Sequence, residues 1–519
     1  MGISDIPGVG RQGVDGGGAF ASTARTKTAI SAYPDTAEVV EGIYQLVQSP
    51  VRGLRAERRE VYREWFRQRC PGSAQTARAA QRHIPGGTQH ELALSEPFPL
   101  QIVRADGAYL WDVDGNRYVD FLQAGGVMLL GNNPPAVRER VLEVLAECGP
   151  ATGMLHRYEI ELARLIGAHV PGVERFRMVG SGTEAVMAAL RVARAFTGKA
   201  HVIKIGGAYH GWSDQMMVGL RLPGTGGWEA TGVPAAAYAL THEAYPNDVD
   251  GLRDLLTRLR HEGGTAAVIH EPLGPEGGAH PIRFEYNHEL RQLCDEFGAL
   301  LIFDEAVTGF RLGLGGAQEF FGVRADLTVF GNIVAGGYAG GGGVGGRAEV
   351  MDRMAGGVTA VGRRAFVGGT LSATSLACVA GYHTLLELER TDAPAVAGRA
   401  GDRLRAGLER LITTHDVPYV AYNYGSIVHL HTSGVLHLNP DDPDFTTQLA
   451  TRTELLAQMS MAFTAEGLIT VAGSRLFTSL ADTDQVVDEA LTAFERVFAG
   501  IEHTPGIEGT PRDADGGRS

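Results

Sequence analysis

Short, continuously apolar segments alternate with amphipathic helical segments through the middle of the chain, and this alternation constrains the fold most strongly. The apolar segments are rich in β-branched residues and cover 175–181, 200–206, 266–272 and 299–305. Strands that are apolar on both faces belong to mostly parallel sheets covered by helices on both sides. The sequence therefore predicts a large α/β domain over 134–392, with its ligand site beyond the carboxyl ends of the strands.

The two flanks of this region predict a second, smaller α+β unit. Helical periodicity runs from about Thr36 to Arg69 and again over 74–83, and residues 101–122 alternate around Asp114-Gly115-Asn116 as in a β-hairpin. Beyond 393 a helix, a strand and a second helix follow. We expect a small domain built from 36–133 and 393–503.

Both ends of the chain look different from this core. Residues 1–35 are rich in Gly, Ala, Ser and Thr, and residues 504–519 are polar. We expect a disordered leader over 1–35 and a disordered tail over 504–519.

Composition excludes several classes of protein. Hydrophobic residues make up 44% of the 519-residue chain, which permits a large core, and the net charge is −14. The basic cluster over 52–69 is interleaved with Glu at helical spacing, as on a solvated helix face, so no nucleic-acid partner is expected. No apolar run is long enough to span a membrane, and the start of the chain does not resemble a secretory signal.

The four cysteines stand far apart and form no CxxC pair. This spacing argues against a zinc site and fits a reducing compartment. We therefore expect a cytoplasmic protein with no metal site.

Three loops that follow predicted strands carry the residues best suited to chemistry. Ser181, Gly182 and Thr183 open a helix and could present hydroxyl and amide groups to a phosphate, although an ordinary helix N-cap explains them as well. Asp304 ends an apolar strand, where a carboxylate needs a cationic partner or caps a turn. Tyr209 lies on a glycine-flanked loop, where its ring can stack on a flat ligand or simply pack.

Six motifs in this order resemble the class III aminotransferases: DGAYLWDVDGNRYVDF, SGTEAVMAALRVARAFTGK, YHGW, EFGALLIFDEAVTGFR, ADLTVFG and GGTLS. The similarity covers about 75–500, and residues 84–102 resemble the glutamate-1-semialdehyde 2,1-aminomutase branch most. The resemblance implies an aspartate-aminotransferase-like fold, fold type I of the enzymes that use pyridoxal 5′-phosphate. It also implies amino-group transfer or transposition on a small amino acid or amino aldehyde.

The resemblance also implies roles for individual residues. Ser181, Gly182 and Thr183 match the phosphate cradle, Tyr209 matches the ring that stacks on the cofactor, and His210 follows it as in the family. Asp304 matches the carboxylate that binds the pyridine nitrogen. The remaining cofactor contacts that the resemblance implies are Ala306, Glu271 and Thr370, the last donated by the partner subunit of a homodimer.

One position departs from the family in a way that affects the chemistry. The family expects Asp-Leu-Thr-x-x-Gly-Lys, and this chain has Asn332 in place of that lysine. An amide cannot make the covalent bond that a lysine amine makes with the cofactor aldehyde, and it cannot move the substrate proton. Only Lys27, Lys199 and Lys204 remain in the chain, and none matches a catalytic position.

Three explanations for Asn332 stay open. The residue is an introduced substitution that traps a bound ligand, a natural variant that uses another base, or the mark of a non-catalytic binding protein. Departures at neighbouring positions, such as Gly180 and Ala306, favour a natural variant. Its resting ligand would then be pyridoxamine 5′-phosphate, or an imine of the cofactor with an amino acid, held without a covalent bond to the protein, and His210 and Tyr338 are the candidate bases.

Two weaker patterns predict no further site. The run Gly341–Gly346 satisfies GxGxxG but does not follow a strand, so we expect a loop there rather than a dinucleotide site. His429 and His431 share one face of a predicted strand, and packed histidines explain them better than metal ligands do.

Overall fold

In the computed structural model, residues 29–93, 95–357 and 364–502 are described. Most of the predicted leader 1–35 and all of the predicted tail 504–519 lie outside these residues.

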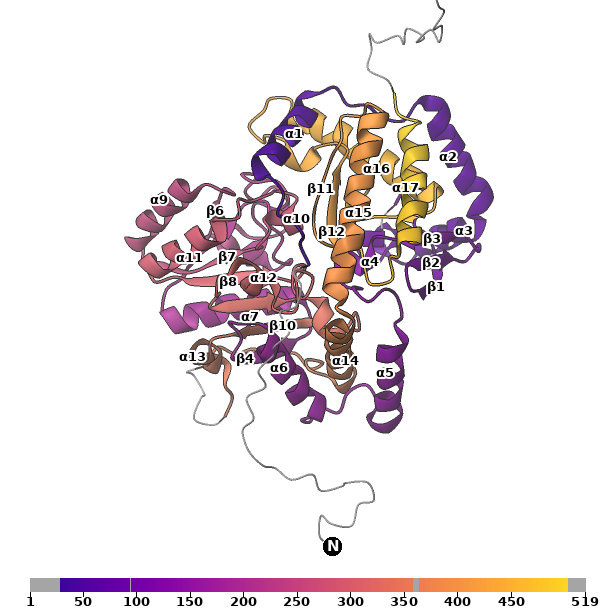
Figure 1. Cartoon of the computed structure of the whole chain (residues 1–519). Coiled ribbons are helices and arrows are strands. Elements are labelled where there is room, and N and C mark those ends of the chain that lie inside the picture. Colours follow the sequence, from indigo (N-terminus) through magenta and orange to yellow (C-terminus); the bar gives the residue numbers. More distant parts are fainter. Residues whose placement is uncertain (1–28, 94, 358–363, 503–519) are drawn as a thin grey trace, which may run out of the picture.

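A seven-stranded sheet forms the centre of the molecule, in the order β4-β10-β9-β8-β7-β5-β6 (Figure 1). Its strands are β4 (Arg175–Val179), β5 (His201–Ile205), β6 (Thr241–Ala244), β7 (Thr265–His270), β8 (Leu300–Glu305), β9 (Leu327–Phe330) and β10 (Gly342–Gly346). Neighbours from β9 to β6 are parallel, whereas β10 is antiparallel to both β9 and β4. The four apolar segments that predicted strands are β4, β5, β7 and β8, so the α/β prediction is confirmed.

Successive residues of the central strands pack into two different apolar layers. In β8, Ile302 packs with α7 (Gly182–Thr197), and Phe303 packs with α9 (Val249–Arg260) and α11 (Tyr286–Phe297) on the opposite face. Both faces of the sheet are therefore covered, which explains why these strands are apolar at consecutive positions.

The glycine run forms strand β10 instead of the expected loop. A Cβ placed on Gly342 would lie 2.0 Å from the carbonyl oxygen of Ser181, and one placed on Gly346 would lie 2.3 Å from that of Asp326. Glycine is thus required because neighbouring backbone passes too close for a side chain. Neither strand periodicity nor β-propensity reports such close packing, so the loop prediction was wrong.

The N-terminal helices begin and end at different residues from those expected. The structure has α1 (Thr36–Gln48), α2 (Ala56–Arg69) and α3 (Pro71–Ala80). Pro50 lies in the break between α1 and α2, where it can neither continue a helix nor donate an N–H. Pro71 starts α3 three residues before the predicted position, since its fixed φ suits the first turn.

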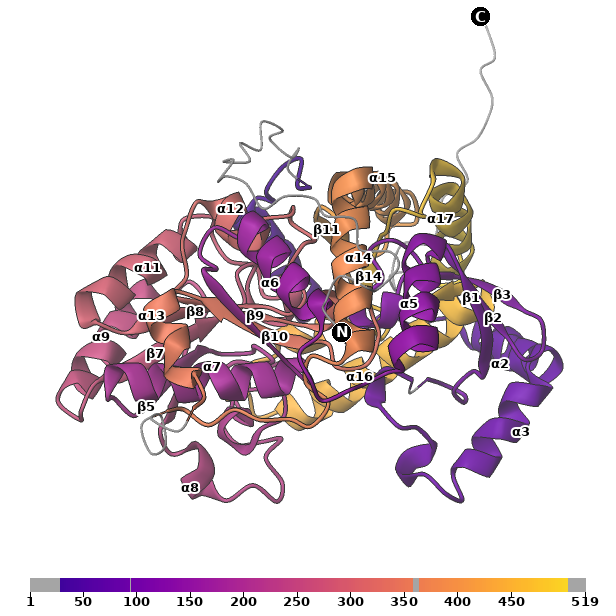
Figure 2. The ribbon, with the colours of Figure 1, turned by 90° about the horizontal axis from the view of Figure 1, so that it is seen from below.

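N-terminal and C-terminal segments share the smaller unit. Strands β1 (Ile102–Asp106), β2 (Tyr109–Asp112) and β3 (Arg117–Asp120) form the predicted hairpin with one additional strand, and β13 (Leu468–Ile469) pairs parallel with β3. Figure 2 shows this sheet beside α16 (Phe445–Ala465) and α17 (Asp484–Phe498). A three-stranded sheet of β11 (Val420–Tyr424), β12 (Ile427–His431) and β14 (Arg475–Phe477) lies against α15 (Ala393–Thr414).

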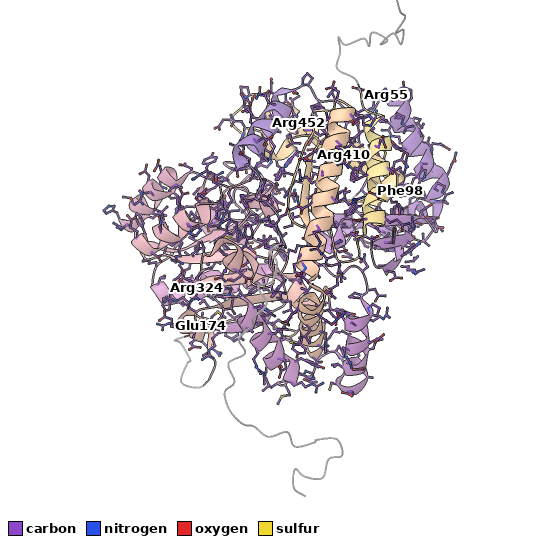
Figure 3. All side chains as sticks on the ribbon, in the orientation of Figure 1. Arg55, Phe98, Glu174, Arg324, Arg410 and Arg452 are labelled. Atoms are coloured by element: carbon purple, nitrogen blue, oxygen red, sulfur yellow. The ribbon has the colours of Figure 1, made fainter. Side chains whose placement is uncertain are left out.

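Arginines tie these two segments together through backbone carbonyls. Arg55 donates to the carbonyl oxygen of Ala499 (2.8 Å), and Arg452 donates to that of Val47 (2.6 Å) (Figure 3). On α2, Arg67 pairs with Glu60 and Glu64 on an exposed face, as the interleaved charges predicted.

The structure describes eight further α-helices, several of which are a single turn long. They are α4 (Gln123–Gly126), α5 (Pro135–Cys148), α6 (Arg157–His169), α8 (Ala235–Tyr238), α10 (Pro275–Gly278), α12 (Gly316–Phe321), α13 (Ala348–Met351) and α14 (Ser375–Thr391). Among the described helices none is long and apolar enough to cross a membrane.

Candidate functional site

Asp304 lies near the carboxyl end of β8, and its side chain is only 5% exposed. Its Oδ2 lies 2.7 Å from Nδ1 of His210, and its Oδ1 accepts a hydrogen bond from the Ala306 N–H (3.1 Å). The carboxylate thus caps the following turn and also has a buried polar partner. The turn-capping interpretation therefore holds at this residue, and a cationic partner for the carboxylate remains a prediction.

His210 is fully buried behind Asp304. Burial lowers its pKa, while the hydrogen bond to Asp304 and the charge of that carboxylate act in the opposite direction. A neutral ring donates Nδ1–H to the carboxylate and leaves Nε2 as an acceptor, and among the described residues Nε2 has no partner.

Tyr209 is positioned through its backbone while its side chain stays 46% exposed. Its N–H donates to Oε1 of Glu271 (3.0 Å), which lies directly after β7. The Glu271 carboxyl also accepts from the N–H groups of Glu276 and Gly277. Burial raises the pKa of Glu271 to about 8, and the charges of Glu276 and Asp304 add to this shift.

The first turn of α7 fits the phosphate prediction. Ser181 is the N-cap, and its hydroxyl accepts from the Glu184 N–H (3.2 Å). In the part of the chain that the structure describes, the N–H groups of Gly182 and Thr183 have no acceptor. A Cβ on Gly182 would meet nothing within 4 Å. Free amides at the positive end of a 16-residue helix, with open space beside them, can hold a phosphate.

The loop that carries Tyr209 and His210 reaches this helix terminus. A Cβ on Gly211 would lie 2.5 Å from Oγ1 of Thr183, and the Trp212 N–H donates to the same oxygen (3.4 Å). The structure therefore connects the aromatic loop, the buried carboxylate and the free amides of α7.

Asn332 starts a single 3-10 turn directly after β9, and its side chain is exposed. The preceding Gly331 contacts Ala306, because a Cβ on Gly331 would lie 2.7 Å from the Ala306 carbonyl oxygen. Asn332 is therefore next to the turn that Asp304 caps. Both lysines that the structure describes bind backbone carbonyls elsewhere: Lys199 contacts Phe297 and Gly298, and Lys204 contacts its own loop.

Two other predicted site residues lie farther along the chain. Tyr338 packs half-buried against the apolar cluster of α5, α6 and α14. Thr370 is exposed on a loop whose Gly369 approaches the Glu184 side chain in the first turn of α7 (3.6 Å from a Cβ on Gly369). A contribution of Thr370 to a partner's site remains a prediction.

His429 and His431 are buried on the face of β12 that meets the α10 turn. Their rings stack on Tyr422, and Nε2 of His429 lies 3.1 Å from the Gly277 carbonyl oxygen. Within the described ranges, no group of three or more His, Cys, Asp or Glu side chains could hold a metal ion.

The structure adds a charged pair that the sequence did not reveal. Arg475 at the start of β14 donates to the carbonyl oxygen of Glu276 (2.6 Å) and to its carboxylate (3.1 Å). Glu276 has a left-handed backbone with φ of 57°, and its N–H donates to Glu271. The sequence predicted a role for the nearby Glu271, but no local signal marked Glu276 or Arg475.

Comparison with known proteins agrees with this geometry. The family model for class III aminotransferases matches residues 93–498. The chain belongs to the class III aminotransferase family. A glutamate-1-semialdehyde 2,1-aminomutase from Acetivibrio thermocellus is 38% identical over 81% of this chain and 96% of its own length. The corresponding enzyme from Aquifex aeolicus is 34% identical over 80% of this chain and 96% of its own length.

Solved structures show the same fold. An omega-transaminase from Sphaerobacter thermophilus superposes with a TM-score of 0.74 at 30% identity, covering 84% of this chain and 99% of its own. Class III aminotransferases are pyridoxal-phosphate enzymes with the fold type I architecture, so the fold and cofactor class expected from the sequence are both confirmed.

Proposed function

We propose that this chain binds pyridoxal or pyridoxamine 5′-phosphate without a covalent anchor and performs amino-group chemistry on a small amino acid or amino aldehyde. The observation that carries the proposal is the combination of a buried carboxylate at Asp304 with unoccupied amides at Gly182 and Thr183. The first suits a protonated ring nitrogen and the second a phosphate, and one loop joins them.

Different residues of the site would hold different parts of this ligand. Asp304 would accept from the ring nitrogen, Tyr209 would lie against the ring, and Ser181, Gly182 and Thr183 would bind the phosphate. Ala306 and Glu271 would complete the binding site around the cofactor. When bound, the cofactor supplies an electron-accepting ring that stabilises negative charge on a substrate carbon.

The protein's own residues set the protonation of the site. The Nδ1–H of His210 donates to the Asp304 carboxylate and so fixes the orientation of that carboxylate. Glu271 holds its proton near neutral pH because burial raises its pKa to about 8. His210 and Tyr338 are the candidates for the base that replaces the lysine, together with the amide of Asn332 as an orienting group.

The Arg475–Glu276 pair supports a substrate that carries a carboxylate. The two side chains are 18% and 16% exposed. Burial raises the pKa of Tyr209, and the charge of Glu276 adds to this shift. A substrate carboxylate could replace Glu276 on the Arg475 guanidinium, which binds carboxylates in a bidentate fork. The curated relatives named above are enzymes of glutamate-1-semialdehyde, whose carboxylate fits this arrangement.

A cytoplasmic homodimer is part of the same proposal. Large apolar side chains are exposed on three segments near the site: Met154 (77%), Leu155 (75%), Trp212 (73%), Phe366 (63%) and Leu371 (63%). Two of these segments contact each other, because the Leu376 N–H donates to the Pro150 carbonyl oxygen, and the third contacts α7, because the Trp212 N–H donates to the Thr183 hydroxyl. A second copy would cover this apolar surface and bring its Thr370 to the site.

The test compares the natural chain with Asn332→Lys and, as a matched control, Asn332→Gln. Each protein is incubated with pyridoxal phosphate, reduced with borohydride and analysed by peptide mass spectrometry. We expect reversible binding without a peptide adduct in the natural chain and the Gln variant, and an adduct at position 332 only in the Lys variant. An adduct on Lys204 of the natural chain would contradict the proposal.

A non-catalytic binding protein is the second candidate, favoured by Asn332 alone. Amino-group transfer from a panel of small amino acids to bound pyridoxal phosphate separates the two. Turnover by the natural chain supports the enzyme. Binding without turnover in both the natural chain and Asn332→Lys supports the non-catalytic protein.

A further inference from the structure

Lys204 is a fully buried lysine on β5, next to the edge strand β6 of the sheet, and the proposed chemistry does not use it. It lies in β5, where its Cα pairs with Glu243 of β6 and Ile269 of β7. Only three of the 46 Lys and Arg residues in this chain are lysine. A chain that uses arginine almost everywhere retains a lysine at this interior position.

The Lys204 ammonium bridges the two ends of one loop. Its Nζ donates to the carbonyl oxygen of Ala208 (2.8 Å) on the outgoing side, and to those of Val218 (2.7 Å) and Gly219 (3.5 Å) on the returning side. Between these ends lie Tyr209 and His210. Backbone bonds draw the same ends together, because the Gly207 N–H donates to the Gly219 carbonyl oxygen (2.9 Å).

Arginine could not replace this group. An ammonium is compact and offers three donors in different directions, whereas a guanidinium is a planar fork that suits a carboxylate. The space is also limited: a Cβ on Gly206 would lie 2.3 Å from Oε1 of Glu243, and one on Gly219 would lie 2.4 Å from its Cδ. The loop is therefore closely packed around the Glu243 side chain, on the strand next to Lys204.

The charges that face Lys204 come from three elements. Glu243 on β6 and Glu271 and Glu276 after β7 favour its protonated form, and burial opposes it. None of these carboxylates forms an ion pair with Nζ within the described residues, so the three carbonyls are its direct partners. An ammonium held by carbonyls fixes backbone, because each carbonyl must stay in place to satisfy it.

We infer that Lys204 is a positioning residue: its ammonium holds the 206–219 loop closed, so that Tyr209 and His210 face the cofactor pocket. The inference rests on the proposed function for what the loop presents, but the closure of the loop can be measured without any ligand. Among the described residues the Lys204 side chain has hydrogen bonds to backbone carbonyls and none to the side chains of Tyr209 and His210, so it acts through the backbone that carries them.

Lys204→Met removes the donors while keeping the length of the side chain. Lys199→Met is the matched control. Lys199 also donates to two carbonyls, those of Phe297 (3.0 Å) and Gly298 (2.5 Å), and both of these carbonyls lie outside the 206–219 loop. Hydrogen exchange of the ligand-free proteins is followed for peptides that cover 206–221, with peptides of β7 and β8 as internal references.

We expect exchange in 206–221 to quicken at least tenfold in Lys204→Met and to stay within twofold in Lys199→Met, with β7 and β8 unchanged in both. Equal acceleration of β7 and β8 would mean a general structural role and would overturn the inference, as would an unchanged loop. If Lys204→Met does not fold, Lys204→Gln, which keeps two donors, carries the same comparison with an intermediate effect expected.

Affinity for pyridoxamine 5′-phosphate supplies a second readout. We expect Lys204→Met to bind at least tenfold more weakly than the natural chain and Lys199→Met to bind within twofold of it. Failure of the natural chain to bind would refute the proposed function, while the exchange experiment would still decide the role of Lys204. Normal affinity in Lys204→Met would overturn the positioning role alone.

Discussion

At the scale of single residues, the site depends on buried charges with few partners. Asp304 has one side-chain partner and one backbone donor, and its neighbour Glu305 accepts from the Ala317 N–H and the Thr308 hydroxyl instead. The two adjacent buried carboxylates at the end of β8 thus have different hydrogen-bond partners. Of the two, only Asp304 has a hydrogen bond to the loop that carries Tyr209 and His210.

This difference gives a matched pair of variants. Asp304→Asn should weaken pyridoxamine-phosphate binding at least tenfold, because a neutral amide no longer attracts the protonated ring nitrogen. Glu305→Gln should leave the affinity within twofold while lowering the free energy of unfolding by about 1–3 kcal/mol through its lost partners. Titration calorimetry and urea unfolding measure the two quantities. Equal affinities for the two variants would contradict the assignment of Asp304.

Lys204 makes stability depend on pH. Burial lowers its pKa from the ordinary value to about 8 in the folded protein. Between about pH 8 and 10, the unfolded chain keeps this proton and the folded chain has lost it, so this residue's contribution to stability rises with pH. The gap in unfolding free energy between the natural chain and Lys204→Met should widen by up to about 1.4 kcal/mol per pH unit in this range.

Urea unfolding at several pH values measures that gap. Glu271 is present in both proteins. Burial raises its pKa to about 8, so its carboxyl group has largely lost its proton at higher pH. Glu243, Glu276 and His210 are also present in both. A gap that stays constant or narrows above pH 8 would show that Lys204 is not the titrating group.

At the scale of elements, the contact between β10 and the start of α7 fixes the phosphate end of the site. Gly342 lies against Ser181, so the strand positions the helix N-cap directly. The strand exists only because four of its five residues have no side chain. A run of glycines here is therefore a packing element and not a flexible loop.

Gly342→Ala should lower the free energy of unfolding by about 1–3 kcal/mol or more, because its Cβ meets backbone that cannot rotate away. Gly42→Ala is the control: its Cβ would contact only the Val420 side chain at 3.3 Å, and alanine favours the α1 helix. Thermal and urea unfolding compare the two. A Gly342→Ala protein as stable as Gly42→Ala would contradict the close packing.

At the scale of the whole molecule, the exposed apolar side chains around the site predict a dimer. Met154 and Leu155 are the most exposed of them. In sedimentation experiments the natural chain should be a dimer, and Leu155→Asp should shift it towards monomer and weaken cofactor binding at least tenfold. Leu142→Asp, on a similarly exposed leucine (57%) of α5, is the control. A natural chain that sediments as a monomer would contradict the shared site.

Sequence alone determined four of the central strands and the residue types at their carboxyl ends. Apolar runs such as that of β8 mark strands covered on both faces, and the ends of these strands and the loops after them contain Asp304, Tyr209 and Ser181. Burial and turn chemistry of this kind depend on neighbouring residues. The sequence also shows directly that position 332 is an asparagine and not a lysine.

Tertiary structure alone decided which distant groups meet. Arg475 of β14 contacts Glu276 of α10, the Lys204 ammonium joins backbone carbonyls 4 and 14 residues away, and the glycine run becomes a strand because Ser181 lies beside it. Each of these depends on how separate elements pack. Side-chain periodicity along the chain carries no information about which backbone a given residue will lie against.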